Sequence, residues 1–394
     1  MKKLLFLTLI LIISINASDA FTDINKLQTT APSTYSRLLK LAQDNVDNAV
    51  RSEGSELTRW FNRHNRVQRS IDLQNADIVC LEELRELDDR LPVKQFLAKL
   101  SKYNHVFNKR NPSKFAFGQA ILYDPNKLFL LDSFSRWLSD TPNEVSDFTE
   151  GGFGSMVLCA KFQHVENGKI IQNMQPLWVF NVHFPLGEEE KTKCCYKLLE
   201  IINELAGNEP YVVLGDFNTF PDRDGFKQRA ILSAKMQNLT DHLFTESGMK
   251  VSGTFVGTDL DQFKSKFPLE ENMAQLDYIY TSKDLERADD HATVIARTML
   301  EEEPQELSTR NFPSDHLPVV ARIRVGVNPD AKLAALELIQ CHTKLKSVSQ
   351  EIDSIMSEFE KGDISNGARL AQLRREFEEA SRRLDYLNLK TRKN

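Results

Sequence analysis

Six groups of polar residues lie beside apolar runs in this chain of 394 residues. The clearest group follows the apolar run 211–214, which leads into Gly215, Asp216 and Asn218. Side chains alternate along an extended chain, so Asp216 and Asn218 are expected to face one common point. A carboxylate and a carboxamide at one point can bind a cation or orient a water molecule, although an Asx-rich turn has the same sequence.

The other five groups share this layout. They are Asn45 after 38–44, Glu83 after 76–81, Asn181 and His183 at the end of 177–183, Asp277 in 276–280, and Ser314, Asp315 and His316 before 317–320. Taken singly, each has a structural explanation, such as a turn or a core histidine. Taken together, they supply oxygen ligands for a hard divalent cation and no thiolate; the ligands are Asn45, Glu83, Asp216 and Asp315. They also supply two histidines that could meet the charge of a phosphorane, His183 and His316.

Apolar runs bounded by turn signals predict the elements that position these groups. We expect strands at 76–81, 116–123, 127–131, 156–162, 177–183, 211–214, 276–280 and 319–325, and helices at 56–71, 91–100, 192–205 and 226–236. The segment 38–46 could be a helix or a strand. Several strands follow one another without a helix between them. We therefore predict an α/β fold of two packed, mixed sheets with helices outside, and not a doubly wound parallel sheet.

The pattern changes after Asn328 and Pro329. Apolar residues then recur at spacings of three and four, at Leu338, Leu345, Val348, Ile352, Ile355 and Phe359, and, after a break at 361–367, at Leu370, Leu373, Phe377, Ala380, Leu384 and Leu387. This spacing predicts two helices joined by a polar loop, an α-helical hairpin over 329–394. We expect the hairpin to pair with itself; docking on the main domain or binding a protein partner are the alternatives.

The first twenty residues have the layout of a secretory signal peptide. Two lysines precede an apolar run over 4–15, and Ala17 and Ala20 follow it. The run is too short to span a bilayer comfortably. We predict cleavage after Ala17 or Ala20, no stable membrane span afterwards, a polar leader over 21–36, and a secreted or periplasmic protein. The formal net charge of −6 excludes an indiscriminate grip on nucleic acid, but not a nuclease with a local basic groove.

The six groups, in this order, resemble the motifs of the endonuclease/exonuclease/phosphatase superfamily, which includes the deoxyribonuclease-I-like and exonuclease-III-like enzymes. The matching segments are DNVDN, ADIVCLEEL, VFNVHF, LGDFNTFPD, LDYIY and SDHLP, and WLSDTP at 137–142 looks like a segment of bacterial members. The resemblance covers 40–325. It implies a four-layered α/β sandwich with the site at one end of the two sheets, and we place the catalytic domain at 37–328.

The resemblance also implies how the cation would be held. Glu83, with Asn45, would bind Mg²⁺, with Mn²⁺ as the alternative ion, and Asp315 would support a metal. The family usually has glutamine before its metal-binding glutamate. Here Glu82 stands in that place, either as an additional ligand or as an outward-facing group.

The remaining roles that the resemblance implies concern the attacking water and the transition state. Asp216 would orient or deprotonate the water, with Asn218 positioning it. His316, aimed by Asp277, would donate to the phosphoryl oxygens, and His183 would do so from the other side or assist the leaving group.

These inferences lead to a preferred function and two alternatives. The preferred hypothesis is a secreted, Mg²⁺-dependent phosphodiesterase acting on nucleic acid, in which an activated water attacks the phosphorus in line. The first alternative is a phosphatase or a sphingomyelinase-type phospholipase acting on a phosphorylated lipid or inositol. The sequence Thr219–Pro221 argues against the inositol phosphatases, which carry a charged signature there. The second alternative is an inactive sandwich that serves as a binding module, which the complete set of site residues argues against.

Overall fold

The structure, a computed structural model, describes residues 28–29, 37–46, 60–85, 92–113, 116–148, 154–171, 174–219, 225–255, 273–295 and 314–326, and parts of the tail between 341 and 381. The predicted signal peptide lies outside the described residues, and so does the leader except for Gln28–Thr29. None of the helices in these ranges has the length and apolar character needed to cross a membrane.

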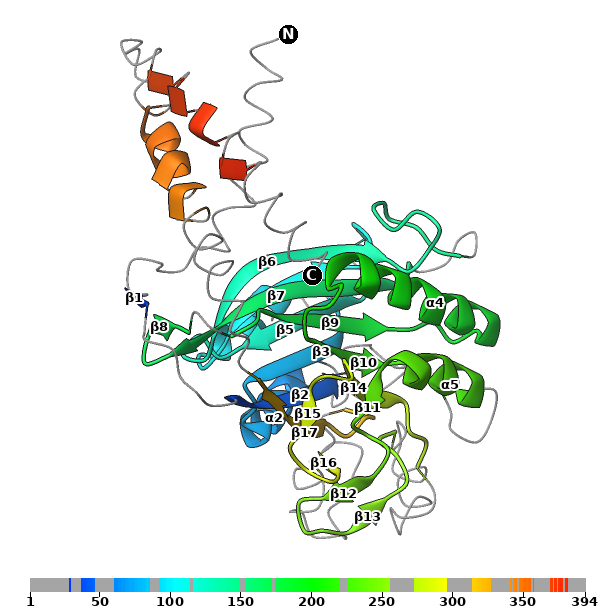
Figure 1. The fold of residues 1–394 in the computed structure, drawn as a ribbon. Helices are drawn as coiled ribbons and strands as arrows, with labels where there is room; N and C mark the ends of the chain where they lie inside the picture. Colours follow the sequence, from blue (N-terminus) through cyan, green and yellow to red (C-terminus); the bar gives the residue numbers. More distant parts are fainter. Residues whose placement is uncertain are drawn as a thin grey trace.

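Two mixed β-sheets form the centre of the fold (Figure 1). The first sheet has the order β1-β8-β7-β9-β10-β14-β11, and β6 also pairs with β7. Its strands are β1 (Gln28–Thr29), β6 (Leu128–Trp137), β7 (Met156–Glu166), β8 (Lys169–Ile170), β9 (Leu177–His183), β10 (Tyr211–Asp216), β11 (Gln237–Asn238) and β14 (Asp277–Thr281).

The second sheet has the order β13-β12-β16-β17-β2-β3-β5-β4, and β15 also pairs with β17. Its strands are β2 (Arg37–Asn45), β3 (Ile78–Leu84), β4 (Asn104–Lys109), β5 (Gly118–Tyr123), β12 (Leu243–Thr245), β13 (Lys250–Val251), β15 (Glu286–Arg287), β16 (Ala292–Val294) and β17 (Val319–Val325). Both sheets contain parallel and antiparallel pairs, as predicted.

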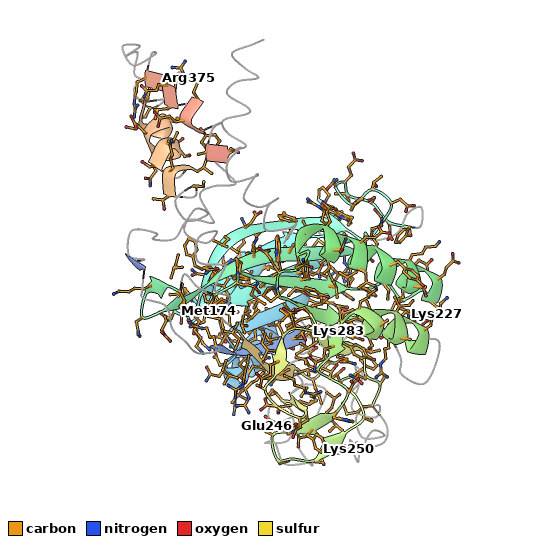
Figure 2. All side chains as sticks on the ribbon, in the orientation of Figure 1. Met174, Lys227, Glu246, Lys250, Lys283 and Arg375 are labelled. Atoms are coloured by element: carbon orange, nitrogen blue, oxygen red, sulfur yellow. The ribbon has the colours of Figure 1, made fainter. Side chains whose placement is uncertain are left out.

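Alternation along the strands divides the apolar side chains between the layers. On β10, Val212 and Leu214 join the core between the two sheets, whereas Val213 packs on the outer side with α4 (Glu188–Leu205) and α5 (Gly225–Lys235). On β2, Leu41 joins the inner core and Ala42 the outer one, under α2 (Trp60–Gln74) and α3 (Val93–Lys99). The order helices, sheet, sheet, helices is the four-layered sandwich that the sequence predicts. Figure 2 shows the side chains that fill these layers.

The segment 38–46, for which the sequence allows a helix or a strand, forms the strand β2. It pairs with β17 on one side and β3 on the other. Its polar end, Gln43 to Asn45, is buried, because each of these side chains finds a hydrogen-bond partner: Gln74 donates to Asp44 at 2.8 Å, for example. The strand predicted at 127–131 extends to Trp137, since the long strand β7 pairs with it throughout.

The described part of the tail agrees with a helical hairpin. Apolar side chains from both predicted helices form one cluster, which contains Val348, Ile352, Ile355, Leu370, Leu373 and Phe377. Arg369 donates two hydrogen bonds, of 2.6 and 2.8 Å, to the Glu351 carboxylate. The two halves therefore contact each other, and a role in docking or partner binding stays a prediction.

A buried histidine in β7 predicts how stability depends on pH. Burial lowers the pKa of His164 from 6.5 to about 3, and the charge of Arg37 adds to this effect. Between these pH values the unfolded chain binds a proton that the folded protein does not, so the free energy of unfolding falls as the pH decreases, by about 1.4 kcal/mol per pH unit. In urea titrations between pH 7.5 and 4.5, His164→Leu should lose this part of the dependence. If the free energy of unfolding fell with pH equally in the wild type and in the variant, His164 could not be the cause of this dependence.

Candidate active site

Three site residues lie in a row across the first sheet. In the parallel pair β9 and β10, His183 is opposite Asp216, and in the antiparallel pair β10 and β14, Asp216 is opposite Asp277. Gly215 allows this close pairing, because a Cβ atom there would lie 1.9 Å from the carbonyl oxygen of Val182. The strand register alone therefore brings two carboxylates and an imidazole to one edge.

The second sheet adds two residues to this edge. The Asn45 Nδ2 lies 3.3 Å from Glu83 Oε1 and 3.0 Å from Asp216 Oδ2, so one amide joins the carboxylates of the two sheets. Glu83 has a φ of 59° beside an irregularity in β3, between Leu81 and Leu84. This bend re-aims its side chain, as bulges beside active sites commonly do.

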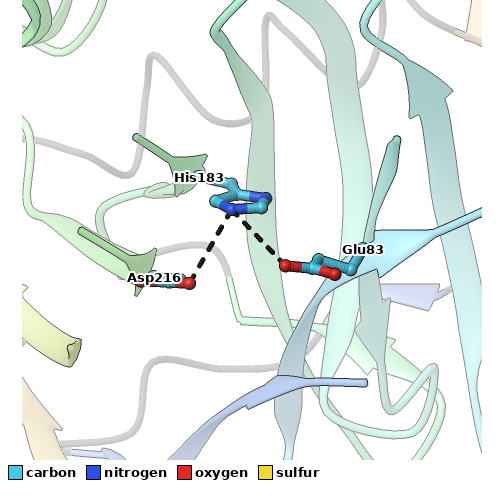
Figure 3. Close-up of side chains that lie close together, drawn as sticks. All are labelled: Glu83, His183 and Asp216. Carbon is cyan, nitrogen blue, oxygen red and sulfur yellow. Dashed lines mark ion pairs between the residues drawn. The ribbon is translucent and has the colours of Figure 1, made fainter. Parts of the chain in front are cut away.

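Glu83, His183 and Asp216 converge on one point (Figure 3). The His183 Nε2 lies 3.8 Å from Glu83 Oε1 and 3.7 Å from Asp216 Oδ2. These are the same two oxygens that the Asn45 amide approaches. Two carboxylate oxygens thus face a common centre, with the Asn45 amide nitrogen beside them. The binding of a cation by these three residues stays a prediction.

His316 and Asp277 form a second pair in the same site. The His316 Nδ1 lies 2.8 Å from Asp277 Oδ2, and Thr254 Oγ1 donates to the same oxygen. Burial lowers the pKa of His316, but the charge and hydrogen bond of Asp277 outweigh this, and the net pKa is well above 6.5. The hydrogen bond with Asp277 orients the ring and favours its charged form, and the catalytic role of the pair stays a prediction.

The two histidines differ in charge. Burial lowers the pKa of His183 well below 6.5, and the nearby charges of Arg110 and His316 lower it further. The two pKa shifts have opposite directions, which favours the uncharged imidazole for His183 and the imidazolium for His316. The site therefore holds one charged donor and one neutral ring on either side of Asp216.

Asp216 and Asn218 do not share the orientation that strand alternation predicts. The strand ends at Asp216, and Asn218 has a φ of 50°. The Asn218 side chain donates to the carbonyl oxygen of Phe184 at 3.0 Å, while its backbone N–H donates to Asp216 Oδ1 at 2.8 Å. Asn218 thus fixes Asp216 through its backbone. Burial raises the pKa of Asp216 to about 7, a value suited to accepting a proton from water.

Asp315 and Glu82 occupy other places. Asp315 is buried beside Ser314 and belongs to neither of the two groups of convergent ligand atoms that the described residues form, so its role at the metal stays a prediction. Glu82 is fully buried and accepts a 2.7 Å hydrogen bond from Gln43 Nε2, so it does not face outward. Burial raises the pKa of Glu82 well above 4.5. A protonated carboxyl has the shape of the glutamine usual in this place.

Three residues that sequence reasoning missed hold the site together. Gln43 Nε2 donates to Asp277 Oδ1 at 2.8 Å as well as to Glu82, Thr254 donates to Asp277, and Arg110 Nη2 donates to the His183 carbonyl at 2.8 Å. Gln43 lies 234 positions from Asp277. Only the fold brings them together.

Removing the Gln43 amide should weaken the site. We expect Gln43→Leu to lower kcat by about tenfold to a hundredfold, because Asp277 Oδ1 would lose a buried donor, worth about 1–3 kcal/mol. Glu82→Gln is the matched control, since a glutamine oxygen still accepts from Gln43. Steady-state kinetics on a phosphodiester would measure both variants. Equal losses in the two would contradict this account of Gln43.

The donor set fits a hard divalent cation. Glu83 and Asp216 supply carboxylate oxygens, the His183 nitrogen lies beside them, the Asn45 amide presents its Nδ2 to both carboxylates, and every cysteine among the described residues is a free thiol. Oxygen ligands without thiolate suit Mg²⁺ or Mn²⁺, and the imidazole nitrogen in the same group also suits Zn²⁺, so the donor set indicates a divalent cation without selecting one. The two carboxylates lie in different sheets. The packing of the two sheets, and not a flexible loop, therefore sets the distance between them.

Such a cation centre, next to a charged histidine at one end of two packed sheets, defines a metal-dependent phosphoester hydrolase. The chain belongs to the Endonuclease/Exonuclease/phosphatase family, whose model matches residues 45–316. This match confirms the resemblance seen in the six groups of polar residues. The first of these groups, Asn45, and the last, ending in His316, are the two ends of the matched segment.

Several known proteins resemble this chain in sequence or in structure. The uncharacterized protein YbhP of Escherichia coli K12 is 26% identical over 269 residues, 64% of this chain and 84% of its own, and the uncharacterized protein L388 of Acanthamoeba polyphaga mimivirus is 26% identical over 224 residues, 56% and 80%. A crystal structure of an endonuclease/exonuclease/phosphatase family protein from Bacteroides thetaiotaomicron has a TM-score of 0.59 at 20% identity, covering 74% of this chain and 99% of its own. The mannosyl-6-phosphatase Bt3783 of the same species has a TM-score of 0.55 at 20% identity, covering 72% and 99%. These two structures share the fold.

Proposed function

We propose that this protein is a Mg²⁺-dependent phosphodiesterase that hydrolyses nucleic acid. The observation that supports this most is the arrangement around Asp216, which has the ligand pair Glu83 and Asn45 on one side and the charged pair His316 and Asp277 on the other. Attack of water on a phosphoester needs an oriented nucleophile and donors for the negative charge that develops. The site has both within one buried edge.

Each residue has a separate task in this proposal. Glu83, Asp216 and Asn45 would hold the Mg²⁺, which neutralises charge on the phosphate when bound. Asp216 orients the water and takes its proton. His316 donates to a non-bridging oxygen and stabilises the charge that builds there. The neutral His183 donates a hydrogen bond from the opposite side.

A substrate panel tests the proposal. The protein from Phe21 onward would be assayed with Mg²⁺, Mn²⁺ or EDTA against plasmid DNA, RNA, sphingomyelin, inositol phosphates and a hexose phosphate. The Asp216→Ala variant, purified in parallel, controls for contaminating nucleases. We expect metal-dependent cleavage of a nucleic acid that the variant lacks. Hydrolysis of only the lipid or the phosphomonoesters would overturn the nuclease assignment in favour of the phosphatase or phospholipase alternative.

We also propose export from the cytoplasm, on the basis of the signal-peptide layout of residues 1–20. The amino terminus of the protein recovered from outside the cytoplasm should begin at Ser18 or Phe21. Recovery of full-length chain from the cytoplasm alone would argue against export.

A further inference from the structure

Two arginines and a phenylalanine form a row across three strand ends at the site's edge of the second sheet. Arg85 follows β3 directly, and Phe117 directly precedes β5, where Leu84 and Gly118 are paired. Arg110 follows β4, and its backbone N–H donates to the Phe117 carbonyl at 2.9 Å. The guanidinium carbons of Arg85 and Arg110 lie 4.3 and 5.4 Å from the centre of the Phe117 ring. Both cations therefore contact one aromatic ring.

This row adjoins the catalytic residues. The rings of Phe117 and His183 meet edge to face, with centroids 5.7 Å apart. Arg110 donates to the carbonyl of His183, and Arg85 stands two positions after Glu83. Arg110 is only 5% exposed, and its Nε has no hydrogen-bond partner among the described residues. Arg85 and Phe117 are half-buried, so part of each side chain remains accessible to solvent.

Carboxyl groups of the site lie near this row, those of Glu83, Asp216 and Asp277 among them, together with the His316 ring. The protein as a whole has a formal charge of −6. Two guanidinium groups on one ring, beside His183, thus form a local positive group in a protein of net negative charge. A guanidinium stacked on an aromatic ring is held in one orientation, and its planar donors match the oxygens of a phosphate.

We propose that Arg85 and Phe117, backed by the buried Arg110, bind an anionic group of the substrate that flanks the phosphate undergoing hydrolysis. This inference rests on the proposed nuclease function and narrows it. It favours a substrate that carries a second phosphate next to the scissile one, as an oligonucleotide does. It disfavours a phosphocholine lipid, whose neighbouring group is a cation that two arginines would repel.

Matched dinucleotides test this subsite. The substrates are dTpdT, with one phosphate, and its 5′- and 3′-phosphorylated forms, which place a second phosphate on either side of the scissile bond. For the wild type, we expect kcat/KM to be at least about tenfold higher for one of the phosphorylated forms. Arg85→Met should reduce this preference to about one, and Phe117→Leu should reduce it partly, because the guanidinium would lose its stacking surface.

The matched control is Arg136→Met. Arg136 stacks on Phe134 with its guanidinium carbon 4.5 Å from the ring centre, but that ring packs against Trp178 and not against a site residue. This control should keep the wild-type preference. Equal kcat/KM for all three dinucleotides in the wild type, or an undiminished preference in Arg85→Met, would overturn the subsite and leave the nuclease assignment standing. Cleavage of none of the three by a protein that does cleave plasmid DNA would overturn the subsite alone, and failure to cleave plasmid DNA and RNA as well would overturn both.

Discussion

Replacing Asp216 by asparagine should lower kcat by about a thousandfold, because the site loses the group that orients the water and accepts its proton, an effect of about 10²–10⁴ for general bases. Asparagine has the shape of aspartate, and its amide oxygen can still accept the 2.8 Å hydrogen bond from the Asn218 backbone. The loop should therefore keep its structure. Hydrolysis of bis(p-nitrophenyl) phosphate with Mg²⁺, together with a thermal melt, would measure activity and folding separately.

Two further variants serve as controls for this prediction. Asp216→Ala should be as inactive as the asparagine variant, since both lack the carboxylate. Asp284→Asn removes a carboxylate from an exposed position and should behave as the wild type. If a folded Asp216 variant kept wild-type turnover, Asp216 could not be the group that activates the water.

The second large effect is expected at His316. Changing His316 to alanine should reduce kcat by at least about a hundredfold, since a preorganised donor to a developing oxyanion contributes about 10²–10³. Its charge is essential to this role, and the pair with Asp277 at 2.8 Å maintains that charge. Asp277→Asn should therefore also be strongly impaired, although Asp277 need not touch the substrate.

A double-mutant cycle tests whether Asp277 acts through His316 or has an independent role. If Asp277 acts only through His316, then adding Asp277→Asn to His316→Ala should cause little further loss of kcat. Losses that simply add in the double variant would mean that Asp277 has a task of its own, and the orientation argument would fail.

Strand ends were the part of the site that the sequence predicts well. An apolar run that stops at a polar residue is readable in one chain, and the register of β9, β10 and β14 then places three such residues side by side, as the row of His183, Asp216 and Asp277 shows. The spacing argument for Asn218 was wrong for a local reason. Alternation holds only within a strand, and β10 ends at Asp216, so a residue with a φ of 50° aims its side chain elsewhere.

Cross-sheet partners could not be predicted. The hydrogen bonds from Gln43 to Asp277 and from Arg110 to His183 join positions 234 and 73 residues apart. Neither has a local pattern, since a polar residue near a strand end reads equally well as a solvated group. The same limit applied to Glu82, whose burial depends on a partner in β2.

The position of the ligands on two different sheets has a consequence for the whole molecule. A cation bound by both Glu83, from the second sheet, and Asp216, from the first, would link the two sheets. Its binding energy would then add to resistance against unfolding, by about 2.7 kcal/mol at a hundred times the dissociation constant. The melting temperature therefore becomes a substrate-free assay of ion choice, in which the preferred ion raises it most and Asp216→Ala removes the gain.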